Sequence, residues 1–299
     1  MMTAVLSNSG VNDHTRRELL FQGEVLVYSA SPATTELISF ARELISEAFG
    51  GLDPETAQHE LPVEDFAKLL ADLKPRFIHH PRCKKLLPAV IEERGCDPGQ
   101  TYFDVPRLRT STSNDYLVSG ISYAFHPHRD CWYSAPFSQV NWWMPVYAVV
   151  PENVMAFHPA YFDRPVRNGS ADYDYAEWNR TSRHNAATHV SKDTRVQPRP
   201  EEPIELEPQV RVVPEAGGTL MFSGAQLHST VPNTSGKTRF SIDFRTVHID
   251  DVRAHRGAPN VDAECTGTTL RDFVRCNDLA VMPEDLALEY EREALAGVS

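Results

Sequence analysis

The sequence has few of the features that mark secreted, membrane-embedded or nucleic-acid-binding proteins. Its five cysteines are an odd number and form no C-x-x-C pair, which favours a reducing cytoplasm over a disulfide framework. No apolar run approaches the roughly 18 residues of a membrane span, and the N-terminal segment lacks the apolar stretch of a signal peptide. Basic residues are outnumbered 29 to 41, which argues against nucleic acid or an anionic membrane as the main partner. We therefore expect a cytoplasmic globular protein.

Helical periodicity is confined to the two ends of the chain. Residues 34–50, 62–74 and 83–95 have the apolar spacing of amphipathic helices, although Pro88 weakens the third. We expect the pair Thr34 and Thr35 to cap the first helix. Residues 283–297 predict a C-terminal amphipathic helix, with Pro283 at its start and acidic residues in its first turn.

The middle of the chain, about residues 100 to 250, has short β-rich runs punctuated by proline, glycine and Asn/Asp/Ser clusters. Many short strands without intervening helices are typical of a sandwich, jelly roll or barrel. Residues 161–203 are polar and have almost no strand pattern. A structureless insert of this length is usually a lid or binding loop, or else disordered. We expect a single domain spanning residues 1–299, with 161–203 as a lid over the site.

Two strand-like runs near residue 235 carry the strongest local signal. Residues 227–233 and 237–247 are joined by a Ser-Gly turn, which predicts a β-hairpin that brings His228 opposite Ser241. Alternation in the second run predicts one buried apolar face and an opposite polar face that lines a small-molecule pocket. That polar face consists of Arg239, Ser241, Asp243 and Arg245.

The stretch FHPHRD, residues 125–130, raises the question of a metal site. His128 and Asp130 are two apart and project to the same side of an extended chain. With His228 they would supply two imidazoles and one carboxylate, the set diagnostic of non-haem Fe(II) oxygenases. His126 lacks the required spacing from Asp130, so we interpret it as a neighbour of the site or a structural residue. A second H-x-D, at 248–250, has no downstream histidine and arginine and is rejected.

These residues together resemble a known family. His128-x-Asp130, His228, and Arg239 with Ser241 follow the order and spacing of the Fe(II)/2-oxoglutarate-dependent dioxygenases. The approach GTLMFSGAQLHSTVPN is most similar to the phytanoyl-CoA dioxygenase-like branch. The resemblance covers about residues 100 to 250. It implies a double-stranded β-helix, or jelly roll, flanked by N-terminal helices on the outer sheet. It also implies an insert between the fourth and fifth core strands, where residues 161–203 fall.

The resemblance also implies roles for the residues. Fe(II) would bind His128, Asp130 and His228, and the far carboxylate of 2-oxoglutarate would meet Arg239 and Ser241. O2 would be the third reactant, with succinate and CO2 as products. Because family members that halogenate lack the carboxylate ligand, Asp130 favours hydroxylation or a related oxidation.

Other site residues follow from strand position. Trp142 and Trp143 lie on opposite faces of one run, and an inward Trp143 would flank the cofactor together with Asn141. Three residues are interpreted as substrate contacts: Trp132, which follows Asp130 directly and would shape the mouth of the site, and Asp243 and Arg245 on the polar strand face.

Three functions remain open at this point. The first is an oxygenase that hydroxylates a small polar metabolite, and the second a metal-dependent hydrolase on a cupin-like barrel with zinc at the same ligands. The third is a non-catalytic barrel that binds a small molecule. Arg239 favours the first, because hydrolysis gives no reason for an anion-binding arginine there. Residues 161–199 hold seven Arg/Lys against five Asp/Glu, which indicates an anionic or polar substrate such as an acid, a sugar or an amino-acid derivative. Desaturation, epoxidation, cyclisation and the oligomeric state also remain open.

Overall fold

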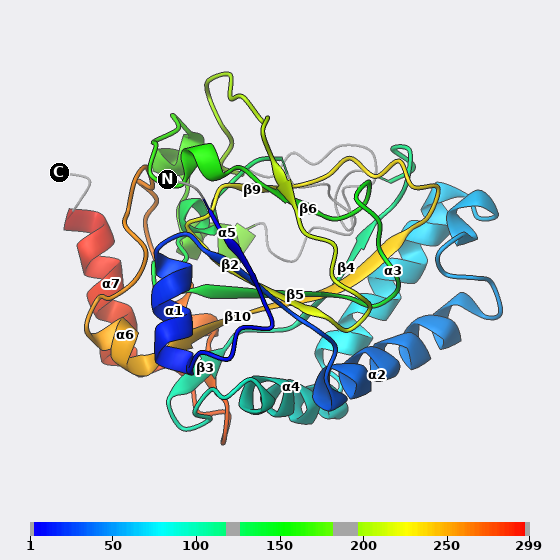
Figure 1. Cartoon of the computed structure of the whole chain (residues 1–299), viewed down its shortest axis with the longest axis horizontal. Coiled ribbons are helices and arrows are strands. Elements are labelled where there is room, and N and C mark those ends of the chain that lie inside the picture. The colour runs from blue at the N-terminus through cyan, green and yellow to red at the C-terminus, as the bar shows by residue number, and fades with distance from the viewer. Residues whose placement is uncertain (1–2, 118–125, 182–196, 297–299) are drawn as a thin grey trace.

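The structure is a computed structural model that describes residues 3–117, 126–181 and 197–296 (Figure 1). Its described part contains two β-sheets with helices around them. The larger sheet has the order β1-β2-β8-β5-β10-β3-β11, with β4 also paired to β10. Its strands are β1 (Val5–Ser7), β2 (Val25–Tyr28), β3 (Thr101–Phe103), β4 (Arg107–Ser111), β5 (Val140–Pro145), β8 (Thr219–Ser223), β10 (Arg239–His248) and β11 (Val274–Arg275).

The smaller sheet has the order β7-β6-β9. It consists of β6 (Met155–Phe157), β7 (Val210–Arg211) and β9 (His228–Thr230). An isolated bridge between His128 and His228 adds the segment around residue 128 to its edge. The predicted strand over residues 116–125 lies mostly outside the described residues, as does the middle of the predicted lid.

The three predicted N-terminal helices are confirmed as α2 (Pro32–Phe49), α3 (Val63–Ile78) and α4 (Pro81–Glu93), and the C-terminal one as α7 (Glu284–Ala296). The predicted cap of α2 is wrong. Ser31 caps this helix, because its hydroxyl oxygen accepts a hydrogen bond from the Thr34 N–H. In turn, the backbone N–H of Ser31 donates to the hydroxyl oxygen of Thr34. Pro32 fits this start because the first helical position needs no N–H donor.

Three further helices were not predicted: α1 (Asp13–Phe21), α5 (Tyr175–Thr181) and α6 (Ile249–Arg253). α1 lacks the periodic spacing of apolar residues that predicts an amphipathic helix, because the apolar residues of DHTRRELLF are all in its last turn. The strands β1 and β2 were missed as well. They extend the large sheet by pairing β2 to β8, with Leu26 opposite Met221.

The main core lies between the outer face of the large sheet and the N-terminal helices. Phe240, Ile242 and Phe244 of β10 are fully buried in it, as the alternation predicted. Phe49 of α2 packs edge-on against Phe240 at 5.8 Å between ring centroids. Burial of each such side chain contributes about 1.5–3 kcal/mol to the free energy of folding. Burial of this apolar face therefore determines that the polar residues of β10 point to the opposite side of the sheet. The predicted β core with flanking helices is confirmed.

The predicted hairpin of residues 227–247 is wrong. β9 pairs with β6, whereas β10 lies in the larger sheet, where Ser241 is opposite Arg109 and Pro145 rather than His228. Asn233 stabilises the loop between β9 and β10, because its side-chain amide donates hydrogen bonds to the Ser111 and Lys237 carbonyls. A Ser-Gly turn specifies a reversal of the chain, not that the two flanking strands pair with each other.

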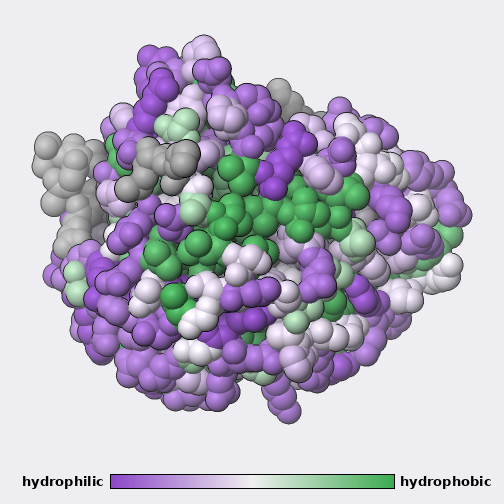
Figure 2. Space-filling model, in the orientation of Figure 1, coloured by the Kyte–Doolittle hydropathy of each residue, from purple (hydrophilic) through white to green (hydrophobic). Residues whose placement is uncertain are grey.

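On the face shown in Figure 2, apolar side chains gather in a band over β2 and β6, and polar side chains cover most of the rest. No helix in the described ranges is long and apolar enough to cross a membrane.

Candidate metal centre

Three predicted ligands meet between the two sheets. His128 and His228 exchange backbone hydrogen bonds of 2.9 and 3.0 Å, which sets their imidazole rings side by side with centroids 4.3 Å apart. Asp130 begins a short 3-10 helix, and its Oδ1 lies 3.5 Å from Nε2 of His128 and 3.9 Å from Nε2 of His228. All three side chains are buried, and their ligand atoms lie within 4.8 Å of one another.

Backbone carbonyls fix the orientation of both histidines. Nδ1 of His128 is 2.8 Å from the carbonyl of His126, and Nδ1 of His228 is 2.9 Å from the carbonyl of Gln226. A carbonyl can only accept, so Nδ1 carries the proton in each ring and the Nε2 lone pair faces the cluster. This is the arrangement that orients histidine ligands in metal sites.

The Asp130 carboxylate is held in a complementary way. Its Oδ2 accepts hydrogen bonds from the side-chain amides of Gln139, at 2.9 Å, and Asn141, at 2.8 Å. Oδ1 is thereby turned toward the two Nε2 atoms. Asn141 was predicted to flank the cofactor, and the structure shows its side chain bound to this carboxylate. Sequence reasoning missed Gln139, although it lies two residues before Asn141 on the same strand face.

The charges of these groups suit a cation. Burial and, after it, the neighbouring His128 lower the pKa of His228 to about 3. Burial raises the pKa of Asp130, but the neighbouring His128 imidazole and the charge of Arg245 outweigh burial and lower it. Two imidazole nitrogens and a carboxylate oxygen therefore direct lone pairs at one another, which a divalent cation would stabilise. The donor set fits the metal that the sequence predicted.

Arg239 and Ser241 lie on the inner face of β10. Nη1 of Arg239 donates to the Asn153 carbonyl at 3.0 Å, and its guanidinium stacks 5.5 Å from the Trp143 ring centroid. Nε of Arg239 and the hydroxyl of Ser241 are buried without a hydrogen-bond partner among the described residues. Burial lowers the pKa of Arg239 to about 10. Such a guanidinium strongly favours an anionic ligand, since an unpaired buried charge is costly.

The three residues predicted to contact substrate have different surroundings. Asp243 pairs with Arg109 at 2.8 Å, and Arg245 pairs with the buried Asp104 at 2.9 Å while its Nε lies 3.7 Å from Oδ2 of Asp130. Trp132 does not fit its predicted place at the mouth of the site. It is fully buried, and its indole donates to a carboxylate oxygen of Asp262 at 2.7 Å, so it packs in the core.

The two rival histidines have structural contacts. His126 contributes its carbonyl to His128, and its ring lies 2.8 Å from the Pro198 carbonyl. His248, in the rejected second H-x-D, caps α6 by accepting a bond from the backbone of Asp250. Within the ranges that the structure describes, the cluster of residues 128, 130 and 228 is the one group with metal-binding geometry.

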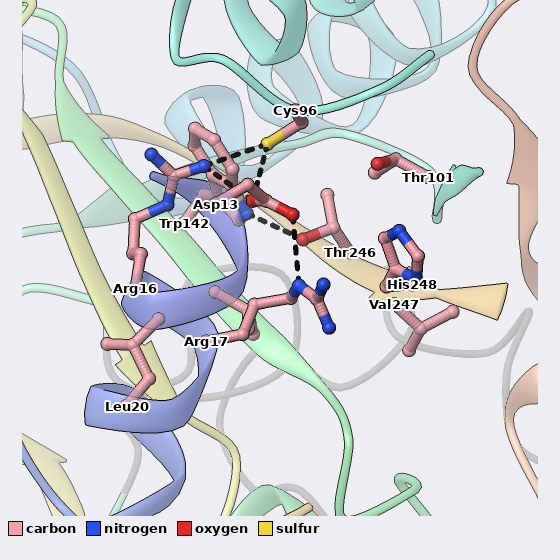
Figure 3. Close-up of a pocket in the computed structure, with 11 residues that line it drawn as sticks. Asp13, Arg16, Arg17, Leu20, Cys96, Thr101, Trp142, Thr246, Val247 and His248 are labelled. Carbon is pink, nitrogen blue, oxygen red and sulfur yellow. Dashed lines mark hydrogen bonds and ion pairs between the residues drawn. The ribbon is translucent and has the colours of Figure 1, made fainter. Parts of the chain in front are cut away.

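A second polar cluster lies beside α1, away from the ligands (Figure 3). Asp13 binds Arg16 at 2.6 Å and Arg17 at 2.9 Å, and Cys96 lies 3.2 Å from Arg16. Burial raises the pKa of Cys96 above its ordinary value, so the thiol stays protonated. These contacts join α1 to the body of the protein.

No protein-family model matches the chain, and no curated protein matches its sequence. Among solved structures, it is similar to SnoN from nogalamycin biosynthesis, described as a non-heme alpha ketoglutarate dependent epimerase. The identity is 15% over 79% of this chain and 84% of that one, with a TM-score of 0.39.

The chain is also similar to EvdO2 from Micromonospora carbonacea var. aurantiaca, solved in complex with 2-oxoglutarate. It is 13% identical over 80% of this chain and 92% of that one, with a TM-score of 0.42. AviO1 from Streptomyces viridochromogenes Tue57 is 14% identical over 85% of this chain and 100% of that one, with a TM-score of 0.40. At these values the likeness carries no argument about activity, and the chemistry rests on the side chains described above.

Proposed function

We propose that this protein is a non-haem Fe(II)- and 2-oxoglutarate-dependent oxygenase. It hydroxylates an unactivated C–H bond of a small polar metabolite and releases succinate and CO2. Two observations carry the proposal: three buried metal ligands that meet at one point, and the Nε of Arg239 and hydroxyl of Ser241, which are buried without a hydrogen-bond partner among the described residues. Arg239 and Ser241 lie on the same face of β10 as Arg245, whose Nε is 3.7 Å from Asp130.

The order of the strands supports a jelly-roll core. From β7 onward the chain alternates between the sheets, with β7 in the small one, β8 in the large one, β9 in the small one and β10 in the large one. Residues 161–203 fall between β6 and β7, where the family places its insert. This alternation is the signature of a double-stranded β-helix.

Each group of residues has its own task in this proposal. His128, Asp130 and His228 hold the metal and leave other coordination positions open, while Gln139 and Asn141 keep the carboxylate oriented. When bound, ferrous iron supplies the redox chemistry by which O2 oxidises both 2-oxoglutarate and the substrate.

The cosubstrate is held on the same inner face. Arg239 and Ser241 bind the far carboxylate of 2-oxoglutarate, and Trp143 supports the guanidinium. Hydrolysis by a zinc ion at the same ligands would not require buried hydrogen-bond donors such as Arg239 and Ser241, which argues against the hydrolase alternative. The cation-binding geometry in turn speaks against a purely non-catalytic barrel.

The test is anaerobic addition of Fe(II) and 2-oxoglutarate, followed by the weak visible metal-to-ligand absorption band. Wild type should show it, and Asp130→Ala should lose it. Arg239→Gln should raise the 2-oxoglutarate needed for half-saturation about tenfold or more, since a charge-assisted bidentate pair is lost.

His126→Ala is the matched control for His128→Ala. Both remove an imidazole, but residue 126 contributes only its backbone carbonyl to the ligand, so the band should persist in this variant. Absence of the band in wild type, together with no succinate from any substrate pool, would remove the proposal.

A further inference from the structure

In addition to Arg239, two further arginines, Arg107 and Arg245, form a cationic pair near the metal ligands. Nη1 of Arg107, on β4, and Nη1 of Arg245, on β10, both bind Oδ2 of Asp104, at 2.7 and 2.9 Å. The other oxygen of Asp104 accepts the backbone N–H of Arg245 at 2.8 Å. One carboxylate therefore serves two guanidinium groups.

The two other acids near this pair have further partners of their own. Asp130, 3.7 Å from Nε of Arg245, belongs to the metal in the proposed function. The neighbouring Asp243 is engaged bidentately by Arg109, with contacts of 2.8 and 3.4 Å. Burial lowers the pKa of Arg107, and the charge of Arg245 lowers it further, as expected when two cations are held together.

The two arginines can be reached from solvent, but their carboxylate cannot. The side chains of Arg107 and Arg245 are 23% and 22% exposed, against 4% for Asp104. Arg107 uses a single nitrogen, Nη1, for Asp104 and for the Val105 carbonyl. A guanidinium has five N–H donors in a planar fork, so such a pair can still bind an oxyanion.

We propose that the substrate carries an oxyanion group, a carboxylate, sulfate or phosphate, which binds between Arg107 and Arg245. This inference rests on the proposed function and names its substrate class. Since Arg245 also lies beside Asp130, the carbon that is oxidised is within a few bonds of the charged group.

The test is calorimetric titration of sodium sulfate, methyl phosphate and acetate, at constant ionic strength, into protein saturated with 2-oxoglutarate and Fe(II) without oxygen. Saturating 2-oxoglutarate keeps the probes away from Arg239. At least one probe should bind saturably, and the strongest identifies the kind of oxyanion. Arg107→Gln should weaken it about tenfold, and Arg107→Lys should weaken it less because the charge is kept.

Arg253→Gln is the control, because this exposed arginine of α6 lies outside the site. It should bind the probe as wild type does, and Arg107→Gln should keep its affinity for 2-oxoglutarate. Failure of all three probes to bind, or equal binding by wild type and Arg107→Gln, overturns the inference. Failure of the proposed function has a different signature: the visible band is absent, while oxyanion binding to the metal-free chain persists and still depends on residue 107.

Discussion

Removing the Asn141 amide should weaken metal binding without touching a ligand. Asn141 donates to Oδ2 of Asp130 at 2.8 Å in a buried site, and a hydrogen bond to a charged group contributes about 1.5–3 kcal/mol. Gln139 still holds the same oxygen at 2.9 Å, so we expect the lower end of that range. Asn141→Ala should therefore raise the metal Kd roughly tenfold, as typical for residues that orient metal ligands.

The assay is anaerobic competition for Fe(II) or Co(II) between the protein and a chromophoric chelator. Gln139→Leu should give a similar loss, and the double variant should lose more than the sum, because the two amides share one acceptor. Asn233→Ala is the control: it removes a buried amide whose partners are the Ser111 and Lys237 carbonyls and Ser235, so it should lower the Tm and leave metal affinity unchanged. An unchanged Kd in Asn141→Ala with a lowered Tm would refute the orienting role.

Two further predictions concern stability. Asp251→Ala should lower the unfolding free energy measured by denaturant titration by roughly 3 kcal/mol, because a fully buried carboxylate paired with Arg17 and Arg256 is lost. Asp250 is exposed, so Asp250→Ala should lower it by less than about 1 kcal/mol. Equal losses in the two variants would contradict this prediction. Burial, then the charge of Arg109, lowers the pKa of Lys74 to about 7. At this residue the unfolded chain then binds more protons between about pH 7 and 10. Lys74 should therefore make the unfolding free energy rise with pH by at most about 1.4 kcal/mol per unit, less where solvent screens the charge, and Lys74→Met should remove this contribution.

The pair His128 and Asp130 could be predicted because its signal is local, whereas His228 was assigned from the order and spacing of the family motif. A two-residue spacing fixes a shared side for His128 and Asp130, and the alternation of β10 fixes the direction of Arg239. The sheet in which β10 lies could not be predicted this way, since its partners β4 and β5 are far away in the sequence.

The residues that support the ligands were harder to predict. Asp104 follows a three-residue strand, and nothing nearby in sequence indicates its two arginine partners. Trp132 was placed at the substrate mouth because it follows Asp130, but the 3-10 helix that starts there turns it into the core. Strand periodicity does not apply within such a turn.

The central place of β10 has a consequence for how the protein is made. This strand pairs with β3, β4 and β5, which all precede it by more than ninety residues and therefore leave the ribosome well before it does. Pairing over such separations makes folding slow and leaves unpaired strand edges exposed to aggregation while the chain grows. The nascent chain therefore depends on protection of these edges until β10 has emerged.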